Sequence, residues 1–167
     1  EETLRQDIKL LSYHDPLYPA LAKKFSQAPI LLYYKGIIRE NSAGVAIVGS
    51  RRCTDYGKQA AVEAAYYLGQ NNIPVISGMA RGIDGYAHTA CLKAGGYTIA
   101  FLGNGVDICY PKEHDGLLAG IIENGAVISG YPPRTRPRPE YFPERMSSSA
   151  AGAIKYLWLR RVKTAEP

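Results

Sequence analysis

The feature that most constrains this chain is a repeated pattern of a short apolar run, a turn that contains glycine, and a segment with helical spacing. The apolar runs begin at Gly44, Ile73, Tyr97 and Ala126. Near-continuous apolar runs are typical of strands that are buried on both faces. Parallel strands need crossover connections, which are usually helices. The pattern therefore predicts an α/β fold with a mainly parallel, doubly wound sheet.

The chain of 167 residues has the length of about one domain, and three parts can be distinguished within it. Residues 1–43 are a lead-in to the same domain, residues 44–145 form the α/β unit, and residues 146–167 form a tail. Helices are expected over residues 56–70, 83–94 and 113–123.

The lead-in predicts mixed local structure. Apolar residues at Leu4, Ile8 and Leu11 have helical spacing, and a second short helix is expected to end near Phe25. Residues 30–34 form an apolar and aromatic run that predicts a strand.

Composition excludes several classes of protein. Hydrophobic residues make up 46% and charged residues 21%, which is typical of a folded globular protein. No apolar run is long enough to span a bilayer, and the acidic N-terminus does not resemble a secretory signal, so we expect a cytoplasmic protein without a membrane partner. Cys53, Cys91 and Cys109 are widely spaced, which predicts neither a zinc site nor a disulfide.

The turns after the four strands carry the candidate site. Parallel strands bring their carboxyl ends to one edge of the sheet, where ligands bind in open α/β folds. Glycine lets backbone N–H groups approach a phosphate, and arginine adds forked donors. The candidate phosphate-binding residues in these turns are Gly49, Ser50, Arg51, Ser77, Gly78, Arg81, Gly103 and Asn104. The alternative is that small residues only make tight turns here.

The segment 131–145 has five prolines and four arginines, which predicts either an extended ordered loop or a mobile arm. Tyr141 and Phe142 are interleaved with arginines, as in surfaces that stack bases and contact phosphates. The alternative is that Phe142 plugs the edge of the sheet. The net charge of +5 is compatible with a nucleic-acid partner.

Signals for catalysis are weak. Asp84 and His88 lie four residues apart on a predicted helix, which fits either an acid–base pair or a contact that supports the fold. The chain has no G-x-G-x-x-G or G-x-x-x-x-G-K-[ST] loop, so we expect no nucleotide cofactor. It also has no recognisable nucleophile elbow, and it has no histidine cluster, so we expect no metal site.

Several motifs resemble one known family, the DNA-processing protein A (DprA, or Smf) family. The resemblance covers Leu10 to Arg145 and rests on the strings VAIVGSRRCTDYG, VISGMARGIDGYAH, GGYTIAFLGNGVDICYP, ISGYPP and YFPER. It implies an extended Rossmann-like domain that binds single-stranded DNA, protects incoming DNA, dimerises, and loads a RecA-type recombinase during natural transformation, without being an enzyme. By position, the residues that resemble the family's strand-binding residues are Arg51 and the arginines of the basic arm, Arg134, Arg136, Arg138 and Arg145.

The sequence departs from the family in two places. Gly130 stands where the family usually has a glutamate, and the sequence after Arg145 loses the family pattern. We interpret the tail as a reading-frame shift between Arg145 and Met146, which would make the chain a truncated product that lacks the last core strand in its native sequence. The family's small C-terminal winged-helix-like domain is also absent. Residues 150–159 are then expected to supply a substitute strand or a helix, and the homodimer becomes doubtful.

Two other functions compete with strand binding. The related phosphoribohydrolases of the LOG group also bind phosphates at these strand ends, but they carry a PGGxGTxxE loop that this chain lacks. A folded remnant without affinity for DNA is the third possibility, and it follows from the atypical tail.

Overall fold

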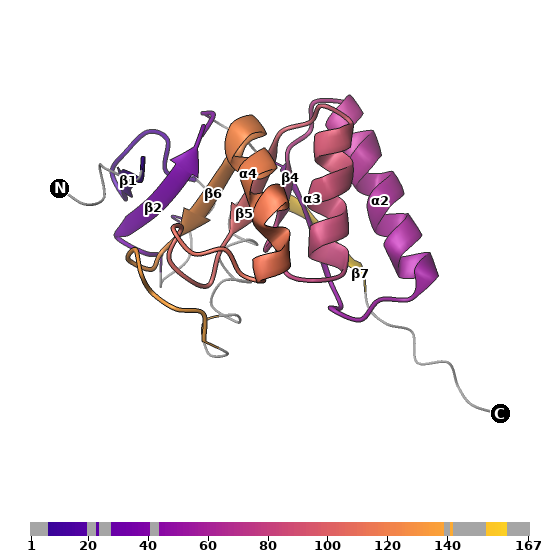
Figure 1. Ribbon diagram of the computed structural model, residues 1–167. Coiled ribbons are helices and arrows are strands. Elements are labelled where there is room, and N and C mark those ends of the chain that lie inside the picture. Colours follow the sequence, from indigo (N-terminus) through magenta and orange to yellow (C-terminus); the bar gives the residue numbers. More distant parts are fainter. Residues whose placement is uncertain are drawn as a thin grey trace.

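The computed structural model describes residues 7–19, 23, 28–40, 44–138 and 141, together with the backbone of residues 153–159. Its strands form one seven-stranded sheet in the order β1-β2-β6-β5-β4-β3-β7 (Figure 1). The strands are β1 (Lys9–Ser12), β2 (Leu31–Gly36), β3 (Gly44–Gly49), β4 (Val75–Ser77), β5 (Thr98–Phe101), β6 (Ala126–Ser129) and β7 (Ala153–Leu159).

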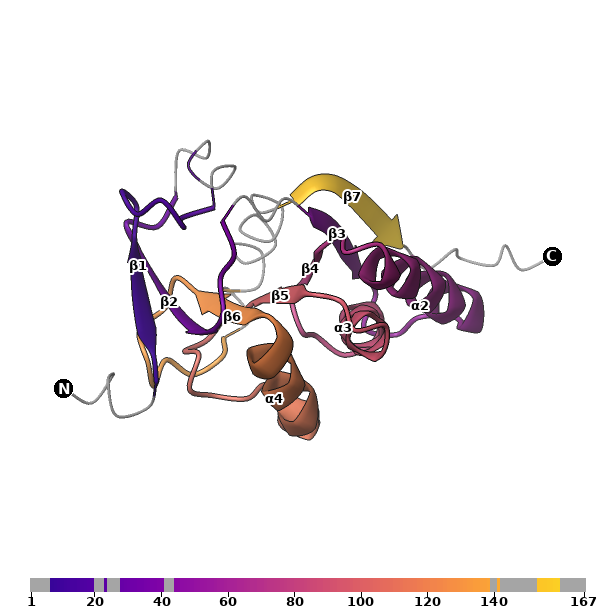
Figure 2. The same cartoon turned by 90° about the horizontal axis from the view of Figure 1, so that it is seen from above.

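The strands β3 to β7 pair in parallel, whereas β1 and β2 are antiparallel additions at one edge. The crossovers between the parallel strands carry the helices α2 (Asp55–Gln70), α3 (Ile83–Lys93) and α4 (Asp115–Asn124), with the short helix η2 (Lys112–His114) before α4. These three α-helices cover one face of the sheet (Figure 2). The prediction of an α/β fold with a mainly parallel sheet is confirmed.

The strand order reverses at β3, which has β4 on one side and β7 on the other. In open α/β sheets, the crevice at such a switch point is the usual place for a ligand. The turn that begins at Gly49 lies at the carboxyl end of β3 and therefore at this switch point.

The apolar runs form two layers of core because their side chains alternate between the two faces of the sheet. Ile47 and Val75 pack beneath α2 and α3, and Ala100 and Val127 pack beneath α4. On the opposite face, the core is formed by strand residues and by the lead-in, and its members include Ala46, Ile76, Ile99, Phe101, Ile128, Leu11, Tyr18 and Leu32.

Local sequence explains how α2 starts and how closely it approaches α3. The Thr54 hydroxyl accepts a hydrogen bond from the Gly57 N–H at 3.1 Å, which caps the first turn. At the other end, a Cβ on Gly69 would lie 2.9 Å from the Ala94 Cβ and 3.0 Å from the Cys91 carbonyl oxygen, so only glycine permits this contact. Burial raises the pKa of the Cys91 thiol to about 11, as expected for an idle thiol in the core.

The lead-in is where the sequence interpretation was wrong. Leu11 belongs to strand β1, where it pairs with Leu32 of β2 and is buried, although its spacing from Ile8 suggested a helix. The free edge of β2 offers a ladder of hydrogen bonds, and this tertiary partner outweighs a short helical pattern. Leu4 and the helix expected to end near Phe25 lie outside the described residues, whereas the strand expected at 30–34 is β2.

The other predicted elements form close to their expected positions. The helix expected over residues 113–123 begins as η2 and continues as α4. The tail supplies a strand rather than a helix, because Ala153–Leu159 pairs in parallel with β3. None of the helices in the described part of the chain is long and apolar enough to span a membrane.

Candidate nucleic-acid interface

The β3–α2 turn presents two arginines at the switch point. Its backbone is closed by Ser50, whose hydroxyl accepts from the Arg52 N–H at 3.1 Å and donates to the Arg52 carbonyl at 2.6 Å. Both Arg51 and Arg52 are exposed, whereas Gly49 and Ser50 are half-buried. Gly49 and Ser50 therefore shape the turn, and the guanidinium groups of Arg51 and Arg52 are the groups that a ligand can reach.

The start of α3 packs directly against this turn. Gly82 has a φ of 76°, and a Cβ at this position would lie 2.4 Å from the Ser50 carbonyl oxygen. The Ile83 N–H donates to the same carbonyl at 3.3 Å. Because only glycine allows this approach, Gly82 brings the β4–α3 turn, which carries Arg81, next to the turn that carries Arg51.

Two predicted phosphate-binding residues lie inside the fold instead of at its surface. The Ser77 hydroxyl is buried and donates to the Ile47 carbonyl at 2.6 Å. The Gly78 N–H is also buried and donates to a carboxylate oxygen of Asp84 at 3.1 Å. These groups hold β4 and its turn in place, so they support the site without lining its surface.

Asp84 and His88 have separate partners that favour a role in the fold. Asp84 accepts from Gly78, while the His88 Nδ1 lies 2.7 Å from the Thr98 hydroxyl. Thr98 donates its proton to the Val75 carbonyl at 2.7 Å, so its oxygen accepts from His88, and Nδ1 is the protonated ring nitrogen. Both residues thus tie α3 to neighbouring parts of the sheet.

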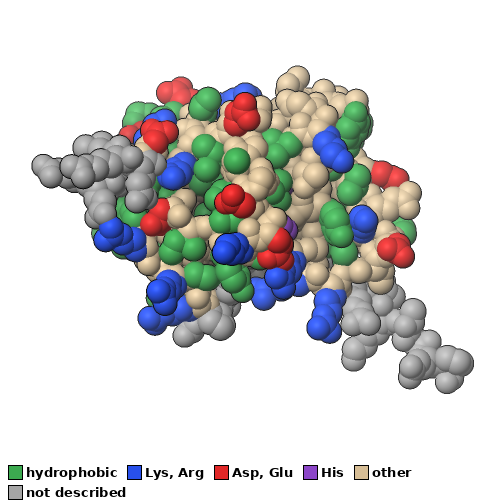
Figure 3. Space-filling view, viewed as in Figure 1, with side chains coloured by type: hydrophobic (Ala, Val, Ile, Leu, Met, Phe, Trp, Pro, Cys, Tyr) green, Lys and Arg blue, Asp and Glu red, His purple; other side chains and the backbone are tan. Residues whose placement is uncertain are grey.

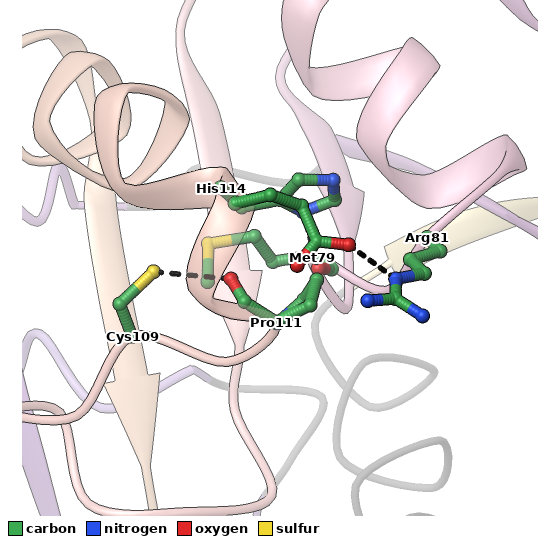
Figure 4. Close-up of polar contacts among 6 residues, drawn as sticks. Met79, Arg81, Cys109, Pro111 and His114 are labelled. Atoms are coloured by element: carbon green, nitrogen blue, oxygen red, sulfur yellow. Dashed lines mark hydrogen bonds and ion pairs between the residues drawn. The ribbon is translucent and has the colours of Figure 1, made fainter.

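Arg81 forms an ion pair that the sequence interpretation did not anticipate. Its Nε donates to a carboxylate oxygen of Glu113 (Figure 4). The two side chains are 65% and 51% exposed. The hydrogen bond from Arg81 and its charge hold the pKa of Glu113 below the usual range. Next to this pair, the His114 Nδ1 lies 3.1 Å from the Met79 carbonyl oxygen. This second contact also links η2 to the β4–α3 turn.

The β5 turn is a buried scaffold. Gly103 and Asn104 are both buried, and the Asn104 amide donates to the carbonyls of Gly105 and Ile108 at 2.9 and 2.7 Å. Asn104 therefore fixes the loop that precedes η2. Like Ser77, Asn104 is buried and stabilises the backbone at this edge of the sheet without lining its surface.

The proline- and arginine-rich segment lies against this scaffold. The Gly105 N–H donates to the Thr135 carbonyl at 2.9 Å, and a Cβ on Gly103 would lie 3.3 Å from the Tyr141 carbonyl oxygen. The Tyr131 and Tyr141 rings stack with their centroids 4.2 Å apart. Residues 131–138 are thus an ordered loop held at the carboxyl edge, which was one of the two possibilities the sequence left open.

Three arginines project from this loop, and we call them the arginine row. The exposed members are Arg134, Arg136 and Arg138, whereas the intervening Pro133, Thr135 and Pro137 are half-buried. Phe142 and Arg145 lie outside the described residues. Figure 3, viewed as Figure 1, shows Lys and Arg side chains gathered along the lower edge of the molecule, where the carboxyl ends of the parallel strands point.

The structure adds three residues to the predicted set: Asp107, Glu113 and Tyr131. No local pattern identifies Glu113, because its partner Arg81 is 32 residues away. Tyr131 stands at the start of the arginine-rich segment, so its aromatic character could have suggested a partner for Tyr141.

The fold and this edge define an α/β protein with a Rossmann-like sheet and a basic surface at its switch point. The chain belongs to the family described as DNA recombination-mediator protein A, which matches residues 9–154. Protein Smf from Synechocystis sp. is 37% identical over 150 residues, covering 87% of this chain and 38% of that protein. DNA processing protein DprA from Streptococcus pneumoniae is 38% identical over 141 residues, covering 84% of this chain and 50% of that protein.

Solved structures agree with this assignment. The X-ray structure of DNA processing protein A from Streptococcus pneumoniae matches with a TM-score of 0.83 and 34% identity, covering 94% of this chain and 56% of that chain. A structure of DNA processing protein A from Helicobacter pylori, described for its single-stranded DNA binding mode, matches with a TM-score of 0.81 and 25% identity, covering 94% and 71%. The family resemblance is therefore confirmed, although the chain spans half or less of the two curated relatives.

Proposed function

We propose that this chain is the strand-binding part of a recombination mediator and that it holds single-stranded DNA at the carboxyl edge of its parallel sheet. The observation that carries the proposal is the position of Arg51 at the switch point of the sheet, in a turn packed against the turn of Arg81 and at the same edge of the sheet as the arginine row. Family membership and the strand-binding relative from Helicobacter pylori support the same ligand.

The accessible groups at this edge suit a phosphate backbone better than base edges. Arginine forms forked, charge-assisted hydrogen bonds with phosphate oxygens, and such contacts carry no sequence information. Tyr141 and Phe142 supply the aromatic surface on which unpaired bases stack. We therefore expect little sequence preference and weaker binding of duplex DNA, whose bases are already stacked.

The roles of the predicted residues follow from where they lie. Arg51, Arg81 and the arginine row, with Arg145, are the phosphate-binding groups. Gly49 and Ser50 shape the first turn. Ser77, Gly78, Gly103 and Asn104 form the scaffold behind these groups.

The proposal extends to the biological role: binding protects the incoming strand and presents it to a RecA-type recombinase during natural transformation. It describes a binding protein and not an enzyme, which agrees with the use of Asp84 and His88 in fold contacts. We further propose that the protein acts in the cytoplasm and that it forms a homodimer if its atypical tail permits this. Sedimentation of the chain alone tests the homodimer. Sedimentation of the chain together with the recombinase and a single strand tests the complex with the recombinase.

The central test compares Arg51→Ala with Lys93→Ala. Both remove one exposed positive charge, but Lys93 lies in the last turn of α3, at the opposite edge of the sheet. Fluorescence anisotropy with labelled oligothymidine should show several-fold weaker binding for Arg51→Ala and little change for Lys93→Ala. The slope of log K against log salt concentration should also become shallower by about 0.7 for each phosphate that the variant no longer neutralises.

Two outcomes would contradict the proposal. Equal losses of affinity in the two variants would mean that charge attracts DNA diffusely, without a site at the switch point. Undetectable binding at low salt by a protein that circular dichroism shows to be folded would favour the remnant without DNA affinity.

A further inference from the structure

Arg134 occupies a turn position that normally suits glycine. The Thr135 N–H donates to the Pro132 carbonyl at 3.2 Å, which closes a turn over residues 132–135. Arg134 is the third residue of this turn and has a φ of 68°. Since Pro133 at the second position cannot adopt a positive φ, the turn is of type II, in which glycine is favoured at the third position.

The carboxylate of Asp107 holds this turn in place. Both of its oxygens accept from the Arg134 N–H, each at 2.9 Å. Gly105 makes room for the contact, because a Cβ there would lie 2.5 Å from the Asp107 carboxylate and 2.8 Å from the Pro132 carbonyl oxygen. A hydrogen bond to an ionised acceptor is stronger than a neutral one, so Asp107 compensates for the unfavourable conformation of Arg134.

The turn sets the direction of the arginine row. Exposure alternates along residues 133–138, so Arg134, Arg136 and Arg138 are presented on one side of the loop. In an extended backbone, residues two apart are separated by about 6–7 Å. This separation is similar to that between successive phosphates of an extended single strand.

We propose that Asp107 is a positioning residue of the strand site: it locks the 132–135 turn so that the arginine row meets consecutive phosphates. This inference rests on the proposed function, because it states how one part of the proposed DNA-binding surface, the arginine row, is aligned with the phosphates of the strand. It also explains why an acidic residue is placed beside a surface that binds an anion.

The proposal predicts an effect opposite in sign to simple electrostatics. Removing an acidic charge near a DNA-binding surface should strengthen binding if the charge acts only through its field. Asp107→Ala should instead weaken oligothymidine binding several-fold and make its salt dependence shallower, because the row loses its register. Asp107→Asn keeps one acceptor oxygen and should restore part of the affinity.

The matched control is Asp115→Ala, which removes an exposed carboxylate from the first turn of α4, at the same edge of the sheet. This variant should bind oligothymidine as tightly as the unmodified chain or more tightly. A gain in affinity in Asp107→Ala that equals the gain in Asp115→Ala would overturn the proposal.

Arg134→Gly separates the arginine from the conformation of the turn. Glycine adopts the positive φ without strain, so the thermal midpoint should stay the same or rise while strand binding falls several-fold. If Asp107→Ala alone does not fold, the double variant Asp107→Ala/Arg134→Gly restores the turn and should still bind weakly. Unchanged affinity in Arg134→Gly would contradict the proposed role of the row.

Trypsin provides a readout that does not depend on DNA. Prolines follow Arg136 and Arg138, so Arg134–Thr135 is the one bond in the row that trypsin cleaves readily. Cleavage there should be faster in Asp107→Ala than in Asp115→Ala. If Asp107→Ala is cleaved faster but the unmodified chain does not bind DNA, the proposed function is rejected while the anchoring of the turn by Asp107 stands. If Asp107→Ala shows unchanged cleavage and unchanged binding, the inference about Asp107 is itself rejected.

Discussion

Arg81 and Glu113 illustrate how the accessible chemistry of a residue depends on a partner that is distant in sequence. Both side chains are more than half exposed, so their ion pair adds little to stability. The pair nevertheless occupies the Nε of an arginine at the proposed phosphate surface. A phosphate that binds Arg81 must share this guanidinium with the carboxylate or displace it.

At the residue scale, we therefore predict that Glu113→Gln strengthens oligothymidine binding a few-fold. Arg81→Ala should weaken it less than Arg51→Ala does, because Glu113 already offsets part of the Arg81 charge. In the double variant Arg81→Ala/Glu113→Gln, the gain in affinity from Glu113→Gln should disappear. A gain in affinity that persists without Arg81 would show that Glu113 repels DNA generally. Anisotropy titrations of the unmodified chain, the variants Glu113→Gln and Arg81→Ala and their double variant measure the difference.

At the scale of elements, the site depends on how closely α3 approaches the β3–α2 turn. Gly82 and Gly95 flank α3 and both have positive φ values, 76° and 72°. Their surroundings differ: a Cβ on Gly82 would lie 2.4 Å from a backbone oxygen, whereas a Cβ on Gly95 would meet nothing within 4 Å. The first glycine is needed for space as well as for conformation.

This difference makes a matched pair of alanine substitutions informative. Gly95→Ala should lower the free energy of unfolding by about 1 kcal/mol, the cost of a left-handed backbone. Gly82→Ala should cost more, about 2–4 kcal/mol, and should also weaken strand binding by displacing Arg51. Urea denaturation gives both values, and equal costs would show that the two turns can separate without penalty.

For the whole molecule, the tail decides whether β3 lies inside the sheet or at its edge. β7 pairs with β3 along the full length from Gly44 to Gly49. Without it, β3 would expose a row of unpaired backbone groups, which is a common cause of aggregation. The hypothesis of a reading-frame shift near Arg145 stays a prediction, and the coding DNA around that codon tests it directly.

We predict that a chain ending at residue 152 is less stable than one ending at residue 160, which keeps β7. Loss of the β3–β7 ladder, which pairs six residues of β3, should lower the free energy of unfolding by about 3–6 kcal/mol, at roughly 0.5–1 kcal/mol for each net hydrogen bond. Urea denaturation and light scattering measure stability and aggregation. Identical midpoints for the two chains would mean that β7 adds no stability.

The sequence by itself determined the parallel part of the sheet, because apolar runs buried on both faces and glycine-containing turns are local signals that tertiary context rarely overrides. It also determined that Arg51 and Arg81 stand in turns, whereas it left open whether the arginine row lies in an ordered loop or in a mobile arm. Only the tertiary structure decided that Leu11 joins a strand and that the tail forms β7, since an edge strand exists only where a partner offers its hydrogen bonds. The same holds for the anchoring of Arg134 by Asp107, which joins residues 27 apart through the folded backbone.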